Sequence, residues 1–174
     1  MSIPAGLYLT DNFIDTQLEA QIIHWLDNRI QNPWSTALSR RTQHFGYEYN
    51  YKGGALKATE PIAGPLLTIR DHLKSLGIID ANQIIVNEYY RNQGIAPHID
   101  SNVFGPVIVG ISLNDSCIMN FTRNEETFNI NLPSRSIMMM TGESRYSWKH
   151  GIDKAIRNKA GNYRRISLTF RSVN

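Results

Sequence analysis

Six short apolar segments in the second half of the chain constrain the fold more than any other feature. They read QIIVNEYY, PVIVGISL, CIMNFT, TFNINL, SIMMMTG and RRISLTFR. Turn residues such as Asn114-Asp115 and Pro133-Ser134 separate one segment from the next. Many short strands joined by turns are typical of a two-sheet β sandwich or jelly roll. We therefore expect a jelly roll over residues 83–174.

Two helices are expected ahead of these strands. Thr16 and Glu19 form a capping-box pattern, and apolar residues follow at roughly helical spacing. A second helix is expected over about 65–76, with a proline at a permitted early position and Gly77 as a stop. The predicted fold class is α+β, with a double-stranded β-helix (jelly roll) core and N-terminal helices packed on one sheet.

Length and composition fit a single domain over residues 1–174, since 41% of the side chains are apolar and 19% are charged. We expect helical support and a short substrate lid over 1–82, followed by the catalytic jelly roll over 83–174. No apolar run approaches the ~18 to 20 residues that cross a bilayer, so no membrane partner is expected.

The one cysteine, Cys117, excludes a disulfide within the chain and favours a reducing compartment. We expect the cytoplasm, or the nucleus in a eukaryote, and a monomer. A net charge of +3 permits a nucleic-acid partner but does not identify one.

Two potential metal ligands stand two residues apart in the segment APHID. In an extended chain His98 and Asp100 point to the same face. They are either a hydrogen-bonded pair or two of the three ligands of an iron site. His150 in SWKHGI is the candidate third ligand, and two histidines with one carboxylate form the facial triad of non-haem Fe(II) oxygenases. The His-x-Asp pattern alone is weak evidence.

The last apolar segment carries two arginines six residues apart. Arg165 and Arg171 share one face of a strand, and inward-facing guanidinium groups require carboxylate partners. A dicarboxylate such as 2-oxoglutarate would satisfy both. Asn87 and Tyr89 share a face of another strand and offer more hydrogen-bond donors to the same acid. Each piece alone is equally typical of an ordinary strand.

Taken together and in order, these motifs resemble those of the AlkB family of Fe(II)- and 2-oxoglutarate-dependent dioxygenases. The matching motifs are Asn87-Glu88-Tyr89, His98-Ile99-Asp100, Gly142-Glu143-Ser144-Arg145, His150-Gly151-Ile152 and the pair Arg165 and Arg171. The resemblance implies that Fe(II) is held by the catalytic residues His98, Asp100 and His150, with O2 and 2-oxoglutarate as cosubstrates. It implies a 2-oxoglutarate site built from Asn87, Tyr89, Arg165, Ser167 and Arg171.

The resemblance also implies that the substrate is an alkyl group on a nucleic-acid base, either removed by oxidative demethylation or left hydroxylated. The motifs are most similar to the branch that hydroxylates a modified wobble uridine in tRNA. Asn102 stands where the family's bacterial repair enzyme has an aspartate. A protein or small-molecule hydroxylase, and a metal-binding jelly roll without turnover, are the alternatives.

The stretch HFGYEYNYKGG (44–54) has aromatic residues at two-residue spacing, which is typical of one strand with a packed face. Two of them, Tyr49 and Tyr51, are candidates for stacking on an extruded base. Arg40, Arg41 and Lys154 are expected to neutralise phosphates, and the short lid favours single-stranded or loop substrates. The substrate contacts that we expect are Tyr49, Tyr51, Asn102, Arg123 and Arg145.

Overall fold

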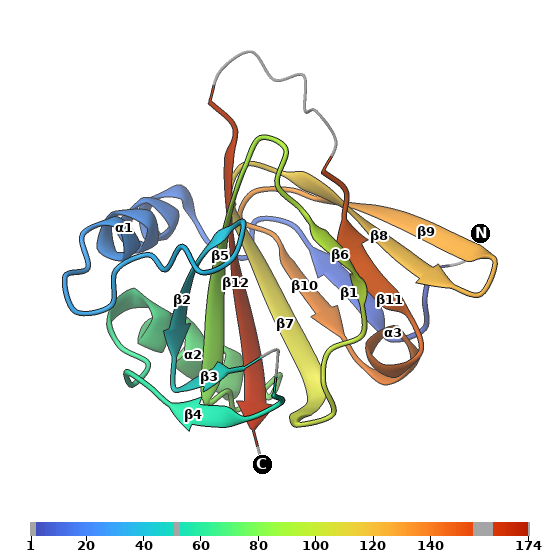
Figure 1. Cartoon of the computed structure of the whole chain (residues 1–174), viewed down its shortest axis with the longest axis horizontal. Helices are drawn as coiled ribbons and strands as arrows, with labels where there is room; N and C mark the ends of the chain where they lie inside the picture. The colour runs from blue at the N-terminus through green and yellow to red at the C-terminus, as the bar shows by residue number, and fades with distance from the viewer. Residues whose placement is uncertain (1–2, 51–52, 155–161, 174) are drawn as a thin grey trace.

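The structure is a computed structural model that describes residues 3–50, 53–154 and 162–173. Most of it is antiparallel sheet. The larger sheet has six strands in the order β1-β10-β7-β12-β5-β2, and the smaller has four in the order β6-β11-β8-β9. A separate hairpin pairs β3 with β4. Figure 1 shows the smaller sheet on the right of the larger one and helices α1 and α2 on the left.

Six of the twelve strands and the two longer helices of the described residues match the segments expected from the sequence. The strands are β1 (Leu7–Thr10), β2 (Arg41–Phe45), β3 (Tyr47–Tyr49), β4 (Leu56–Ala58), β5 (Gln83–Tyr90), β6 (Ile95–His98), β7 (Phe104–Asn114), β8 (Cys117–Arg123), β9 (Glu126–Leu132), β10 (Ile137–Met140), β11 (Lys149–Ile152) and β12 (Arg164–Val173). The helices are α1 (Thr16–Asp27), α2 (Gly64–Ser75) and α3 (Gly142–Tyr146). No helix among the described residues has the length and apolar character needed to cross a membrane.

The pleat of the larger sheet separates two apolar clusters. On β12, Ile166, Leu168 and Phe170 pack against the side chains of α1 and α2. The alternate positions, Arg165 and Arg171 among them, face the smaller sheet, because successive side chains of a strand point to opposite faces. The second apolar cluster lies between the two sheets. The predicted α+β fold, with a jelly-roll core and N-terminal helices packed on one sheet, is confirmed.

Helix α1 begins as expected, but the predicted capping box is wrong. The N-cap is Asp15, whose Oδ1 accepts a hydrogen bond of 2.7 Å from the backbone N–H of Leu18. Glu19 instead reaches the sheet, where it accepts from the backbone N–H of Asn114 at 2.7 Å and pairs with Arg135 at 3.2 Å. The carboxylate therefore anchors the helix to the sheet rather than capping the helix.

The aromatic stretch is not one strand, as its spacing predicts, but two. Gly46 separates β2 from β3 with a φ of +77°, and a Cβ there would lie 1.9 Å from the carbonyl oxygen of Asn82. Only glycine fits such a position. Phe45 before the break packs against the helices, whereas Tyr49 after it packs against the cluster between the sheets.

The N-terminal part of the chain contributes more than helices and a lid. Its strands β1 and β2 form the two edges of the larger sheet. The expected division near residue 82 therefore does not separate two layers of the fold. Strand β2, which precedes residue 82, pairs with β5, which follows it, in one continuous sheet.

Candidate active site

Three side chains converge at one point of the smaller sheet. They come from two of its strands and from the loop that follows one of these strands. His98 is the last residue of β6, Asp100 follows two residues later, and His150 lies on β11. The two histidines are direct partners in the β6–β11 pairing. At Gly151 a Cβ would lie 2.9 Å from the backbone nitrogen of Pro97, so the glycine lets the two strands approach closely.

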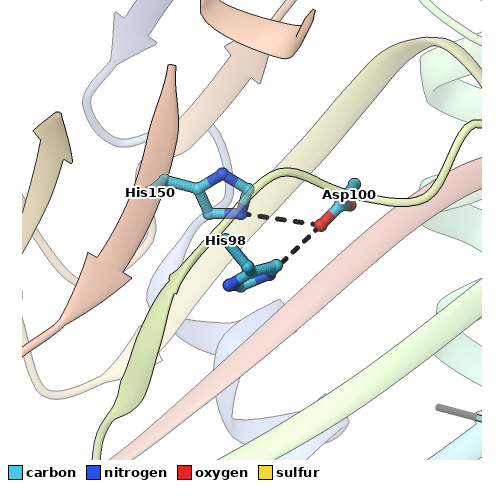
Figure 2. Close-up of side chains that lie close together, drawn as sticks. All are labelled: His98, Asp100 and His150. Atoms are coloured by element: carbon cyan, nitrogen blue, oxygen red, sulfur yellow. Dashed lines mark ion pairs between the residues drawn. The ribbon is translucent and has the colours of Figure 1, made fainter. Parts of the chain in front are cut away.

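The geometry of the three side chains suits a metal ion. Each offers one ligand atom, and these atoms all lie within 4.8 Å of one another. The Nε2 atoms of His98 and His150 lie 3.3 and 3.6 Å from Oδ1 of Asp100, and Figure 2 shows all three side chains pointing toward one another. The Nδ1 atom of His98 lies 2.9 Å from the carbonyl oxygen of Ala96. A proton on Nδ1 leaves the Nε2 lone pair for a metal.

The surroundings also set the protonation states that a metal site needs. Burial lowers the pKa of His150 to about 4, so the imidazole is neutral at pH 7. Burial alone would raise the pKa of Asp100, but the Arg171 guanidinium and the two imidazoles hold it well below its usual range. Two imidazoles and one carboxylate are the ligand set that leaves open positions on Fe(II).

A chamber between the sheets opens beside these ligands, and two buried arginines line it. Arg165 donates from Nη2 to the Ser112 hydroxyl at 2.8 Å, and Nη2 of Arg171 lies 2.9 Å from Oδ2 of Asp100. Among the described residues, the Nε and Nη1 atoms of both arginines have no hydrogen-bond partner. Buried N–H groups without partners are costly, so the chamber fits an anion with two carboxylates.

The other residues expected at the 2-oxoglutarate site line the same chamber. Tyr89 lies on β5 with its ring 5.6 Å from the Arg165 guanidinium carbon, and Ser167 is paired in register with Asn87. The Oδ1 atom of Asn87 accepts a hydrogen bond of 2.7 Å from Nε of Arg40. The structure thus brings all five of these residues together, and Arg40 lies beside them.

A cleft of about 730 Å³ forms the mouth of the site on the side of His98 and Asp100. Tyr49 and Phe104 contribute rings 5.4 Å apart, and exposed Ile99 and Leu38 lie at its rim. Lys154 lines the cleft as expected. Flat aromatic and apolar surface next to a cation is suited to a base and its phosphate.

Arg145 does not lie where a substrate contact requires. Its side chain is 1% exposed, and the guanidinium donates to the carbonyl oxygens of Asp100 at 2.9 Å, Ser101 at 2.8 Å and Phe104 at 3.2 Å. A longer bond of 3.4 Å reaches the carbonyl oxygen of Gly105. The expected substrate contact is therefore corrected: Arg145 fastens the loop that follows the ligand Asp100.

Arg123 and Arg41 are also engaged elsewhere. Arg123 pairs with Glu126 at 2.9 Å and with Glu143 at 2.8 Å, and it does not line the chamber or the mouth. Arg41 pairs with the fully buried carboxylate of Glu88 on the helix side of the sheet. The structure thus gives these two arginines partners within the chain instead of a substrate or a phosphate.

The remaining substrate candidates differ in position. Asn102 is exposed on the loop after Asp100, next to the mouth residue Ser101. Tyr51 lies outside the described residues.

Sequence reasoning assigned Arg40 to phosphate contact, whereas the structure places it at the junction of chamber and mouth, 9% exposed. Strand alternation carries no signal for this position, because β2 begins at Arg41 and Arg40 precedes it.

Comparisons with known proteins identify the family of the chain. The model of the 2OG-Fe(II) oxygenase superfamily matches residues 7–171. The chain is 34% identical to mouse (Mus musculus) tRNA (carboxymethyluridine(34)-5-O)-methyltransferase ALKBH8 in an alignment of 163 positions that covers 87% of this chain and 24% of that protein. It is 30% identical to the Arabidopsis thaliana protein named alkylated DNA repair protein ALKBH8 homolog in an alignment of 212 positions that covers 99% of this chain and 59% of that protein.

The chain thus spans between a quarter and three fifths of the length of these two relatives. The solved structure of OsALKBH1 has the same fold, with a TM-score of 0.74 at 16% identity and with 99% of this chain and 100% of that chain covered. By the family model and these relatives, the chain belongs to the 2OG-Fe(II) oxygenase superfamily, as an AlkB-like member.

Proposed function

We propose that this chain is an Fe(II)- and 2-oxoglutarate-dependent dioxygenase that oxidises an alkyl group on a nucleic-acid base. One observation carries the proposal: the ligand atoms of His98, Asp100 and His150 converge beside buried guanidinium nitrogens without partners. The first group fits Fe(II), and the second fits the two carboxylates of 2-oxoglutarate. When bound, Fe(II), O2 and 2-oxoglutarate would supply the oxidation itself.

The residues of the chain bind, orient and exclude water. Arg165, with Asn87 and Tyr89 beside it, would hold the carboxylate of 2-oxoglutarate far from the iron. Arg171 orients Asp100 by their 2.9 Å ion pair. The apolar side chains between the sheets keep the chamber dry, and the mouth leaves one open route along which a base can reach the ligands.

We propose a single-stranded or loop nucleic acid as the substrate, with RNA, including tRNA anticodon loops, slightly ahead of DNA. The β3–β4 hairpin is short, so little of this chain is available to open a duplex, and an unpaired base costs least to extrude. The mouse relative is named for an activity on a tRNA uridine, which supports tRNA. Lys154 at the mouth would contact phosphate, so binding would weaken as salt rises.

The charges in the chamber favour one kind of base. Arg40, Arg165 and Arg171 face a single carboxylate, that of Asp100. The charges of Fe(II) and 2-oxoglutarate cancel each other, so the loaded chamber keeps an excess of positive charge. Like charge repels, and a base made cationic by ring methylation is therefore disfavoured relative to a base with a neutral or anionic substituent. This supports hydroxylation of a modified base above demethylation of a cationic one.

The test is mass spectrometry of nucleosides after incubation with Fe(II), ascorbate and 2-oxoglutarate. Total tRNA, RNA and DNA carrying ring-methylated bases, and a protein extract are supplied in parallel, and succinate is measured in each. We expect a gain of one oxygen on a tRNA nucleoside and the fastest succinate release with tRNA. Turnover with the protein extract alone would favour the alternative function, hydroxylation of a protein. The absence of succinate in every sample would contradict an oxygenase.

Three further expectations remain proposals. A single domain is supported by the larger sheet, to which both halves of the chain contribute strands. A monomer stays a prediction. A cytoplasmic or nuclear location is supported by the lone, buried Cys117, which requires no oxidising compartment.

A further inference from the structure

Two neighbouring arginines lie at the start of β2. Arg40 directly precedes the strand and Arg41 is its first residue, and their side chains lie on opposite sides of the larger sheet. Arg41 is opposite Glu88 in the β2–β5 register and pairs with it on the helix side. Arg40 lies on the other face, where its Nε donates to Oδ1 of Asn87 at 2.7 Å. The side chains of Arg40 and Asn87 are 9% and 6% exposed, so this contact is shielded from water.

This contact decides which way the Asn87 amide points. A guanidinium group can only donate hydrogen bonds, so the amide oxygen must face Arg40. The amide NH2 group then points away from Arg40 on a side chain that lines the chamber with Arg165. In the opposite orientation the amide oxygen of Asn87 would face the bound carboxylate and repel it. The amide NH2 group would then face the Arg40 guanidinium, donor against donor.

We propose that Arg40 is a positioning residue for 2-oxoglutarate, which acts by holding the Asn87 amide with its NH2 group toward the cosubstrate. The inference rests on the proposed function, because it takes 2-oxoglutarate as the occupant of the chamber. The arrangement adds a directed donor to a wall that already holds unpaired N–H groups of Arg165 and Arg171. It also gives a reason for the burial of Arg40 beside Asn87, from which it is 47 residues distant in the sequence.

The experiment measures binding without turnover. Mn(II) replaces Fe(II), and isothermal titration calorimetry gives the Kd of 2-oxoglutarate. Arg40→Met keeps an unbranched side chain of similar length and removes every donor, and we expect its Kd to rise about tenfold, the effect of one lost hydrogen bond in a desolvated site. Arg40→Lys restores a donor and should recover part of the loss.

The matched control is Arg41→Met, because Arg41 is the neighbouring residue and faces the other side of the sheet. Its 2-oxoglutarate Kd should be that of the wild type, with circular dichroism showing that all variants are folded at the temperature used. A double-mutant cycle with Asn87→Ala tests the route of the effect. If Arg40 acts through Asn87, Arg40→Met should add little to Asn87→Ala.

The outcomes separate this inference from the proposed function. No binding of 2-oxoglutarate by the Mn(II)-loaded wild type would contradict the proposed function itself. Tight binding by the wild type and by Arg40→Met alike would contradict the role of Arg40. Additive effects in the cycle would show that Arg40 acts independently of Asn87. A change confined to the nucleic-acid KM would show that Arg40 acts on the substrate. Either result overturns the positioning role.

Discussion

Arg145 lies buried beneath the loop that carries Asp100, and its partners are carbonyl groups rather than carboxylates. Bonds of 2.8 to 3.4 Å join its guanidinium to four residues between Asp100 and Gly105. The planar fork of a guanidinium can bind several fixed acceptors at once, which a lysine ammonium cannot do. The orientation of the ligand Asp100 therefore depends on a side chain that does not touch the metal position.

We expect Arg145→Lys to remain folded and to bind Mn(II) about ten- to a hundredfold more weakly, as is usual when a residue that orients a metal ligand is lost. Calorimetric titration with Mn(II) measures the affinity directly, and a thermal unfolding curve shows that the variant is folded. Arg123→Lys is the control, since Arg123 pairs with surface glutamates. Equal Mn(II) affinity in Arg145→Lys and wild type would show that the loop needs no such anchor.

His44 is a half-buried histidine on β2, away from the metal ligands. Burial lowers its pKa from the ordinary value, with Arg171 and Arg40 adding to the effect. The unfolded chain therefore takes up a proton at His44 more readily than the folded protein. Stability contributed by neutral His44 is full above the unfolded pKa of about 6.5 and is lost as pH falls below it.

We compare how steeply the free energy of unfolding depends on pH in the wild type and in His44→Gln. Between pH 7.5 and 5.5, with metal removed by a chelator, the wild type should lose more free energy of unfolding than His44→Gln, which has no proton to gain at this position. The difference is at most about 1.4 kcal/mol per pH unit. Urea unfolding at several pH values measures both slopes, and parallel slopes would show that His44 does not titrate in this range.

At the scale of elements, one buried carboxylate joins the helix layer to the sheet. Glu88 on β5 has a fully buried side chain and pairs with Arg41 from β2 and, at 2.7 Å, with Arg164 from β12. Arg164 continues to Asp27 at the end of α1 at 2.6 Å. Burial tends to raise the pKa of Asp27, but its bonds to Arg164 and Trp34 lower it overall. Three strands and a helix thus meet in one charge network.

Arg164→Met should lower the free energy of unfolding by about 1–3 kcal/mol, because it leaves Glu88 buried with one partner fewer. Urea unfolding measures the change. Arg70→Met is the matched control: Arg70 pairs with the exposed Asp71, and the loss should stay within about 0.5 kcal/mol. Equal effects of the two substitutions would contradict a special role for the buried network.

At the scale of the whole molecule, the neighbours Arg164 and Arg165 show how the sheet divides stability from binding. Arg164 faces the helices and is fully paired within the chain, whereas Arg165 faces the chamber with two nitrogens that have no partner among the described residues. A buried donor without an acceptor costs free energy until a ligand satisfies it. The chamber is therefore built for a ligand at the expense of the ligand-free fold.

We expect Arg165→Met to leave the ligand-free protein as stable as the wild type or more stable, and to abolish the rise in Tm that Mn(II) with 2-oxoglutarate gives. Ligands that bind only the folded state raise Tm, so the rise reports binding. Arg164→Met should do the reverse, with a lower Tm and an unchanged rise. Thermal unfolding with and without ligand measures both, and a clear loss of ligand-free stability in Arg165→Met would contradict the assignment.

The sequence by itself determined the local structure and the chemical groups of this protein. Turn residues and apolar runs located six of the eight strands that the structure describes in the second half, as in Gln83–Tyr90, which forms β5 over the same residues. The spacing of His98 and Asp100, and of Arg165 and Arg171, placed each pair on one face, because strand periodicity is a local property. These patterns do not depend on which strands become neighbours.

Only the tertiary structure decided what each side chain meets. Arg40, Arg123 and Arg145 look alike as candidate contacts in sequence, yet one holds a chamber amide, one pairs with surface glutamates and one binds loop carbonyls. The left-handed turn at Gly46 likewise sends Phe45 and Tyr49 to different clusters. The partner of an arginine depends on sheet pairing and burial across many residues of chain, and single-strand periodicity carries no information about either.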